Sequence, residues 1–82
     1  MDENRIYDEL INILKDHSKY PELLEKATLD THIVNDLKVN SVRLIDVVLR
    51  CEDKYGISID DDEVDKIRTI GDAMKLLKAK VH

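Results

Sequence analysis

Residues 36–59 read DLKVNSVRLIDVVLRCEDKYGISI, and this stretch decides the fold. Its middle is apolar over much of a helical circumference, which predicts a helix from Ser41 to Tyr55. Such a helix is either central to the core or exposes part of its apolar face to partners. Gly56 is placed to end the helix in the left-handed conformation. Ile57 and Ile59 then anchor a connector.

Three further helices are expected around this one. The first covers residues 3–17, where apolar side chains recur at the i, i+4, i+7 and i+8 positions of an amphipathic helix. A short one follows the central helix across Asp61–Lys66, because a run of carboxylates suits a helix N-terminus. The last begins at a capping-box pattern made by Thr69 and Asp72 and ends near Lys80.

The connection between residues 18 and 40 is long for so small a chain. Pro21 can open a short helical turn that continues to Lys26. The rest of the connection is too apolar for a free linker, so we expect it to pack against the helices. The sequence therefore predicts an all-α fold: a small four-helix bundle with three longer helices and one short one, a long loop after the first helix, and a single domain over residues 1–82.

Composition limits the possible functions. The 82 residues carry a net charge of −5, with eight acids against four bases between residues 42 and 66. An acidic surface repels phosphate backbones, so we expect no nucleic-acid partner there and instead proteins with basic patches. The charged N-terminus and the lack of an apolar run of about 20 residues predict no signal peptide and no membrane insertion. The lone Cys51 suits a reducing cytoplasm, and we expect a monomer.

Catalytic and metal-binding patterns are absent from the sequence. The three histidines, His17, His32 and His82, have no ligand spacing, and Cys51 is expected to be a small buried apolar side chain. The acids of residues 60–65 invite a calcium interpretation. However, they are consecutive and no glycine follows, so a helix N-terminal cluster without a specific cation site is favoured.

Ser41 stands where an apolar loop meets an apolar helix. Its local sequence favours a helix N-cap at Asn40 or Ser41, worth about 1 kcal/mol. A functional alternative is that Ser41 accepts a phosphate-linked group, which would lie against free backbone N–H groups and the positive end of the helix dipole. Nothing nearby can activate the hydroxyl, so another enzyme would have to perform that modification.

From about residue 3 to residue 79 the chain resembles the acyl carrier proteins, because several motifs follow one another in that family's order. That family's serine motif is usually written DLGxDSL, and residues 36–42 here read DLKVNSV. Residues 52–59 (EDKYGISI) are similar to the family's helix end and connector. Residues 61–63 (DDE) and 66–73 (KIRTIGDA) are similar to its third helix and the start of its fourth. The order and spacing of these motifs, rather than any one of them, favour modification of Ser41, with which a cap role is compatible.

The resemblance implies a non-catalytic carrier. A phosphopantetheinyl transferase would attach 4′-phosphopantetheine to Ser41, and acyl groups would ride on the arm as thioesters in fatty-acid, lipid or polyketide-type biosynthesis. Acyl-loading and acyl-using synthases or transferases would dock through basic patches. The residues expected at the docking surface are Asp36, Asn40, Val42, Arg43, Asp46, Glu52 and Asp53.

Five positions depart from the family pattern. Lys38 replaces the motif's glycine, which should make a positive φ difficult at that point. The residues beside Ser41 also differ, at Asn40, Val42 and Arg43, and together these changes reduce the negative charge of the surface near the serine. Asp60 stands where proline is common in the family. We interpret the chain as a specialised, free-standing carrier outside housekeeping fatty-acid synthesis.

Three alternatives remain open at this point. The cargo could be an aminoacyl, peptidyl or other small group, in which case no apolar cavity for a long chain is needed. The chain could also be an unmodified helical adaptor that binds a partner through its acidic central helix. A cation-binding regulator through residues 60–65 is the weakest interpretation.

Overall fold

The computed structural model describes residues 2–81, and over that range it contains helices and no strands. The elements are α1 (Glu3–His17), the 3₁₀ helix η1 (Pro21–Lys26), α2 (Ser41–Tyr55), α3 (Asp61–Asp65) and α4 (Ile70–Lys80). Three longer helices and one short one are therefore present as the sequence predicts, and the turn at Pro21 is 3₁₀. Among residues 2–81, no helix is long and apolar enough to cross a membrane.

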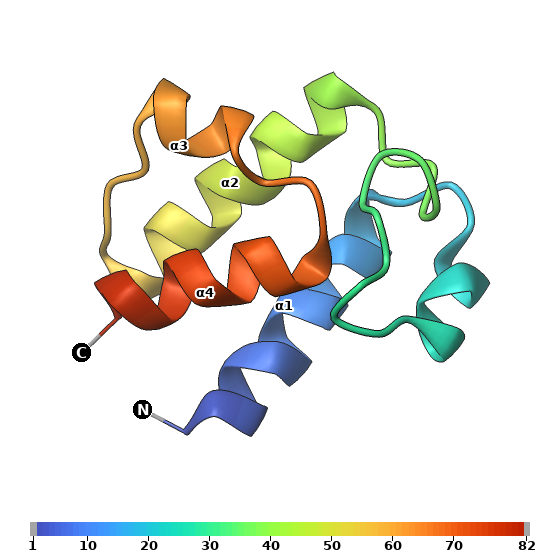
Figure 1. Ribbon diagram of the computed structural model, residues 1–82, viewed down its shortest axis with the longest axis horizontal. Helices are drawn as coiled ribbons and strands as arrows, with labels where there is room; N and C mark the ends of the chain where they lie inside the picture. Colours follow the sequence, from blue (N-terminus) through green and yellow to red (C-terminus); the bar gives the residue numbers. More distant parts are fainter. Residues whose placement is uncertain (1, 82) are drawn as a thin grey trace.

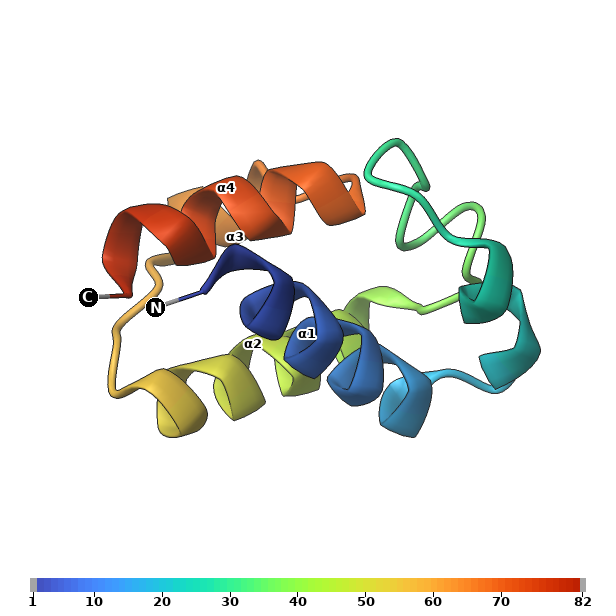
Figure 2. The same cartoon turned by 90° about the horizontal axis from the view of Figure 1, so that it is seen from below.

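Helix α1 is the common support of the bundle, because it packs against α2, α4 and η1. Figures 1 and 2 show α2 and α4 running in the same direction on either side of it, with α3 between the end of α2 and the start of α4. The buried face of α1 includes Leu10 and Leu14, which are 1% and 0% exposed. Helices α2 and α4 are thus held mainly through α1.

Each predicted helix boundary has a local cause in the structure. The Asn40 side chain caps α2, and Gly56 ends the helix with a φ of 63°. The Thr69 hydroxyl accepts a hydrogen bond from the Asp72 N–H, and the Asp72 carboxylate accepts from the Thr69 N–H, both at 3.1 Å. Backbone donation from Thr69, then from Arg68, lowers the pKa of the Asp72 carboxyl. The capping box that begins α4 is confirmed.

The long loop packs against the bundle, as its apolar content predicts. Its residues Ile33, Leu37 and Val39 are each 1% exposed. The Ile33 N–H donates to the Arg68 carbonyl at 2.9 Å, which ties the loop to the segment before α4. The Gly71 N–H donates to the Leu29 carbonyl at 2.8 Å, and a Cβ at Gly71 would lie 2.9 Å from that oxygen. The loop therefore positions the residues that lead into Ser41.

The expectation that Lys38 avoids a positive φ is wrong. Lys38 has a φ of 58°, in the left-handed region. The reason is the burial of both neighbours: Leu37 and Val39 enter the core on either side of the exposed Lys38. The Val39 N–H also donates to the Ile33 carbonyl at 3.3 Å, which closes the loop at this point. Core packing thus imposes the conformation, and lysine tolerates it at a cost of about 1 kcal/mol.

Lys38→Gly should stabilise the protein by about 0.5 to 1 kcal/mol. Glycine removes the left-handed strain, and its greater freedom in the unfolded chain offsets only part of that gain. Urea unfolding of the two proteins measures the difference. Lys38→Ala is the matched control, because it removes the same charge and keeps the strain. An equal gain in the alanine variant would show that the charge, and not the backbone conformation, is unfavourable.

Candidate functional site

Ser41 is the first residue of α2 and is exposed. The cap belongs to its neighbour, because the Asn40 Oδ1 accepts a hydrogen bond from the Arg43 N–H at 2.9 Å. Of the two residues that the sequence offers as the cap, the structure selects Asn40. Within residues 2–81 the Ser41 hydroxyl has no hydrogen-bond partner. Its oxygen is therefore open to solvent and is not needed to hold the helix.

The surroundings of Ser41 do not activate its hydroxyl. Asp36, the nearest preceding acid in the sequence, accepts a hydrogen bond from the His32 N–H at 2.8 Å. His32 itself accepts from the Asn35 N–H at 3.2 Å through Nδ1. Both side chains thus order the loop, and among residues 2–81 no base is hydrogen-bonded to the serine. A serine in this setting lacks the adjacent base that activates a nucleophilic hydroxyl.

The exposed side of α2 begins beside Ser41 and is partly apolar. Val42, Ile45 and Leu49 are 73%, 45% and 53% exposed and follow one another along this side. The opposite side is buried and carries Leu44, Val47, Val48 and Cys51. Helix α2 therefore both supplies the core and exposes part of its apolar face. A contiguous exposed apolar row is typical of a surface that contacts another protein.

The predicted docking acids differ in their surroundings. Asp53 is exposed and Asp46 is half-buried. The Glu52 carboxylate accepts a hydrogen bond from the Ile59 N–H at 2.9 Å and so holds the connector after α2. Glu52 therefore has a structural contact that the sequence does not reveal, whereas Asp46 and Asp53 lie along the same side as the apolar row.

The basic residues of α2 differ in whether a carboxylate lies close to them. Lys54 pairs with Glu9 of α1 at 2.9 Å, and Arg50 lies 3.9 Å from Asp16 of the same helix. The pairing with Lys54 lowers the pKa of the Glu9 carboxyl. Arg43 is exposed, and no carboxylate of residues 2–81 lies within 4 Å of its guanidinium. Arg43 thus adds an uncompensated positive charge two residues after Ser41.

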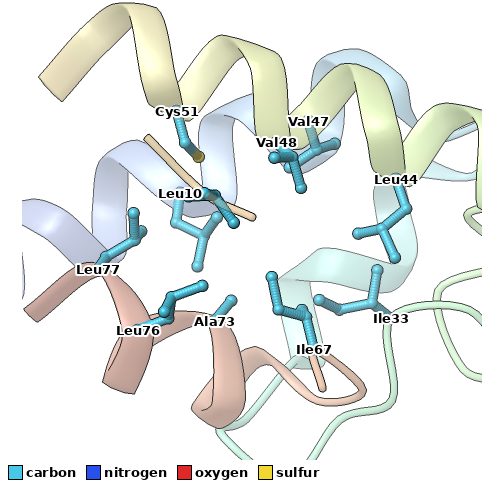
Figure 3. A pocket seen from close by; sticks show the side chains of 11 residues that line it. Leu10, Ile33, Leu44, Val47, Val48, Cys51, Ile67, Ala73, Leu76 and Leu77 are labelled. Carbon is cyan, nitrogen blue, oxygen red and sulfur yellow. The ribbon is translucent and has the colours of Figure 1, made fainter. Parts of the chain in front are cut away.

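An apolar cavity lies between α2 and α4. Figure 3 shows side chains of the two helices converging on it, with Leu10 of α1 projecting between them. Its volume is about 20 Å³, room for one water-sized sphere. The lining side chains are all apolar: Leu10, Ile33, Leu44, Val47, Val48, Cys51, Ile59, Ile67, Ala73, Leu76 and Leu77. Such a lining favours an apolar ligand group over a charged one.

Cys51 belongs to this lining and not to a reactive site. Its thiol is free and buried. Burial raises the pKa of the thiol to about 11, which leaves it protonated at neutral pH and poorly nucleophilic. The expectation of a buried apolar cysteine is confirmed.

The histidines and the acids of residues 60–65 form no metal site among residues 2–81. The His17 ring lies 2.8 Å from the Ile13 carbonyl, at the end of α1, and His82 lies outside the described residues. The acids of residues 60–65 begin α3, where the Glu63 carboxylate accepts from the Asp60 N–H at 3.0 Å. Among residues 2–81, no group of three or more acids, histidines or cysteines is arranged to hold a metal ion.

Sequence reasoning missed the roles of the last basic residues. Lysines in the last turn of a helix commonly form a solvated face that complements the helix dipole, and Lys78 and Lys80 lie in the last turn of α4. Instead the Lys80 Nζ donates to the Ser58 carbonyl at 2.8 Å and lies 3.0 Å from the Glu63 Oε1. Lys78 similarly pairs with Glu3 at 2.8 Å. No local signal could show these contacts, since the partners are distant in the sequence.

Comparisons with known proteins agree with this architecture. The family model for the phosphopantetheine attachment site matches residues 8–77. An acyl carrier protein of Lactobacillus acidophilus is 33% identical over 79 residues, which is 96% of each chain. Another, from Coprothermobacter proteolyticus, is 32% identical over 82 residues, covering 100% of this chain and 98% of that one. The chain belongs to the acyl carrier protein family.

A solved structure shows the same fold. The apo doublet acyl carrier protein from prodigiosin biosynthesis superimposes with a TM-score of 0.76 and 18% identity, over 95% of this chain and 37% of that one. Membership of the family implies a 4′-phosphopantetheine prosthetic group and a non-catalytic carrier. It also implies interaction with synthases and a phosphopantetheinyl transferase. The resemblance and the fold class expected from the sequence are confirmed.

Proposed function

We propose that Ser41 carries the 4′-phosphopantetheine arm and that a phosphopantetheinyl transferase attaches it. The observation that supports this most directly is the exposed, unpartnered Ser41 hydroxyl at the first position of α2. Asn40 already caps the helix, so the serine oxygen can be esterified without loss of the cap. Within residues 2–81, the N–H groups of Ser41 and Val42 have no acceptor. They are therefore free to donate to a phosphate oxygen.

The arm supplies a thiol that holds the cargo as a thioester. The chain's own residues do the rest: Ser41 fixes the attachment point, the start of α2 favours the phosphate charge, and the apolar cavity accepts part of the cargo. The buried Cys51 thiol stays protonated, so it does not compete for the thioester by exchange.

An acyl cargo fits the cavity better than an aminoacyl one. No lining side chain carries a polar group other than the Cys51 thiol, so a charged amine would lose its hydration without a partner. The cavity of about 20 Å³ must expand to hold more than a methyl-sized group. Acyl intermediates of fatty-acid, lipid or polyketide-type synthesis suit such a lining, and an aminoacyl or peptidyl group is the second candidate if the cargo stays in solvent.

Partner enzymes are proposed to dock on the exposed side of α2 and on the loop before it. The proposed contact residues are Asp36, Asn40, Val42, Arg43, Asp46, Glu52 and Asp53. The apolar row that begins at Val42 would supply contact area, and Asp46 and Asp53 would meet basic groups. Exposed charge pairs of this kind are individually weak, and they raise association rates while permitting quick release.

Arg43 should oppose docking by enzymes whose contact surface is basic. We expect Arg43→Glu to raise kcat/KM for modification by a transferase with a basic docking patch about two- to fivefold, or about 0.4 to 1 kcal/mol. Asp46→Arg should lower it by a similar factor. Both effects should shrink as salt rises from low to high ionic strength. Equal rates for the two variants at low salt would place the contact elsewhere.

The chain is further proposed to act as a monomeric, single-domain carrier in a reducing cytoplasm. The buried, free Cys51 supports the reducing compartment, since it has no cysteine partner in the chain. Gel filtration with light scattering measures the oligomeric state.

Intact-mass measurement tests the proposed function. The protein is incubated with coenzyme A, Mg²⁺ and a broad-specificity phosphopantetheinyl transferase whose activity is shown on another carrier. A gain of one phosphopantetheine, mapped to the peptide that contains Ser41, is expected. No gain with this transferase or with a transferase encoded beside the gene would favour the alternative, an unmodified adaptor that binds partners through α2.

A further inference from the structure

The segment that contains α3 forms one wall of the apolar cavity. Ile59 precedes α3 and Ile67 follows it, and both line the cavity. Helix α3 has five residues and none of them is buried. In Figure 1 α3 lies above α4. Apolar contacts hold the wall at its two ends and at the half-buried Val64 of α3, and polar contacts join it to α4.

Lys80, the last residue of α4, makes the polar contacts that join the wall to that helix. Its Nζ donates to the Ser58 carbonyl at 2.8 Å and lies 3.0 Å from the Glu63 Oε1. The Lys80 and Glu63 side chains are 26% and 28% exposed, so this pair is better shielded than most surface pairs. Donation from the Asp60 N–H, then from Lys80, lowers the pKa of the Glu63 carboxyl, and the pair therefore stays charged at neutral pH.

An apolar chain can enter the cavity if α4 and the wall separate, because both line it. The closed cavity of about 20 Å³ has no room for more than a methyl-sized group. Opening disrupts packing between apolar side chains. Packing of the same side chains against the entering chain can replace it. The hydrogen bond and ion pair of Lys80 have no such replacement, because an apolar chain offers no acceptor. Breaking them is the part of the opening that the cargo does not compensate.

We propose that Lys80 is a latch that holds the wall, residues 57–67, against α4 and thereby sets how readily the cavity opens to an apolar chain. The proposal rests on the proposed carrier function for its purpose and on the apo protein for its first test. Lys80 is a positioning residue, because it acts through the wall and does not touch the cavity.

Cys51 reports the opening in the apo protein. Its thiol lines the cavity and is 4% exposed, so a thiol-reactive reagent can reach it only when the structure opens. Lys80→Gln should raise the labelling rate of Cys51 at fixed pH by about threefold or more. Lys78→Gln is the matched control, since it breaks an ion pair of 2.8 Å between the same helix and Glu3 of α1. Lys80→Met repeats the test with an unbranched apolar side chain.

Labelling rates are compared with the unfolding free energies of the same variants. A larger rate increase for Lys80→Gln than for Lys78→Gln, beyond their difference in global stability, supports the latch. Equal increases, or increases that global unfolding explains, overturn it. This test needs no arm on Ser41, so its result is independent of whether the proposed function holds.

Acyl loading supplies the second readout. The melting temperatures of wild type, Lys80→Gln and Lys78→Gln are measured with the bare arm and with acyl groups of four, eight and twelve carbons. The latch predicts that the gain from longer chains is larger in Lys80→Gln than in the other two proteins. A structural role alone would lower all forms of Lys80→Gln equally, and that outcome would overturn the proposal. Failure of the arm to attach would count against the carrier function and leave the labelling test to decide the latch.

Discussion

Ser41→Ala should abolish attachment of phosphopantetheine and leave the fold intact. The substitution removes the only atom on which the arm is proposed to be esterified, so the mass gain should fall from one equivalent to none. Stability should change by less than about 0.5 kcal/mol, because the side chain is exposed and the Ser41 hydroxyl has no partner within residues 2–81. Intact mass after reaction and urea unfolding measure the two quantities on the same sample.

Asn40→Ala is the matched control and should show the opposite pattern. It removes the hydrogen bond from the Arg43 N–H and should cost about 1 kcal/mol of stability. Ser41 remains, so the reaction should still go to one equivalent, although the rate can change if Asn40 contacts the transferase. Full modification of Ser41→Ala would move the attachment point to another residue. A large loss of stability in Ser41→Ala would mean that the serine is a structural residue.

Local patterns in the sequence predict the helices of this protein well. Apolar spacing, Gly56 and the capping box at Thr69 are interactions within a few residues, and the structure contains each of them at the expected place. Lys38 shows where local reasoning ends. Its preference against a positive φ is overcome by the burial of Leu37 and Val39, which only the tertiary structure displays.

In the candidate site, too, some features can be predicted from the sequence and others depend on tertiary packing. Ser41 is singled out by the order and spacing of motifs along nearly the whole chain, since its own neighbourhood indicates only a helix cap. The latch residues could not be found, because Ser58, Glu63 and Lys80 meet across a turn and a helix. The cavity lining comes from α1, α2, α4 and three connecting segments, so its volume depends on how the elements pack.

Leu10→Ala should both destabilise the apo protein and enlarge the cavity. Leu10 is 1% exposed and lines the cavity from α1, so its truncation should cost about 3 kcal/mol. That is a large part of the roughly 5 to 10 kcal/mol expected for a domain of this size. An acyl chain on the arm can occupy the space that the missing methyl groups leave. Loading an acyl group should therefore return about 1 to 2 kcal/mol, at about 0.8 kcal/mol for each methylene buried.

Leu14→Ala separates cavity filling from general destabilisation. Leu14 lies one turn further along the same face of α1, is 0% exposed and is not part of the cavity lining. Leu14→Ala should lower the free energy of unfolding of the apo form by a similar amount. Loading an acyl chain should then stabilise this variant no more than it stabilises the wild type. Urea unfolding of the bare-arm and acyl-loaded forms of the wild type and the two variants gives the six free energies of this comparison. Equal recovery in the two variants would place the chain outside the cavity, because only a chain that lies against residue 10 can distinguish the two leucines.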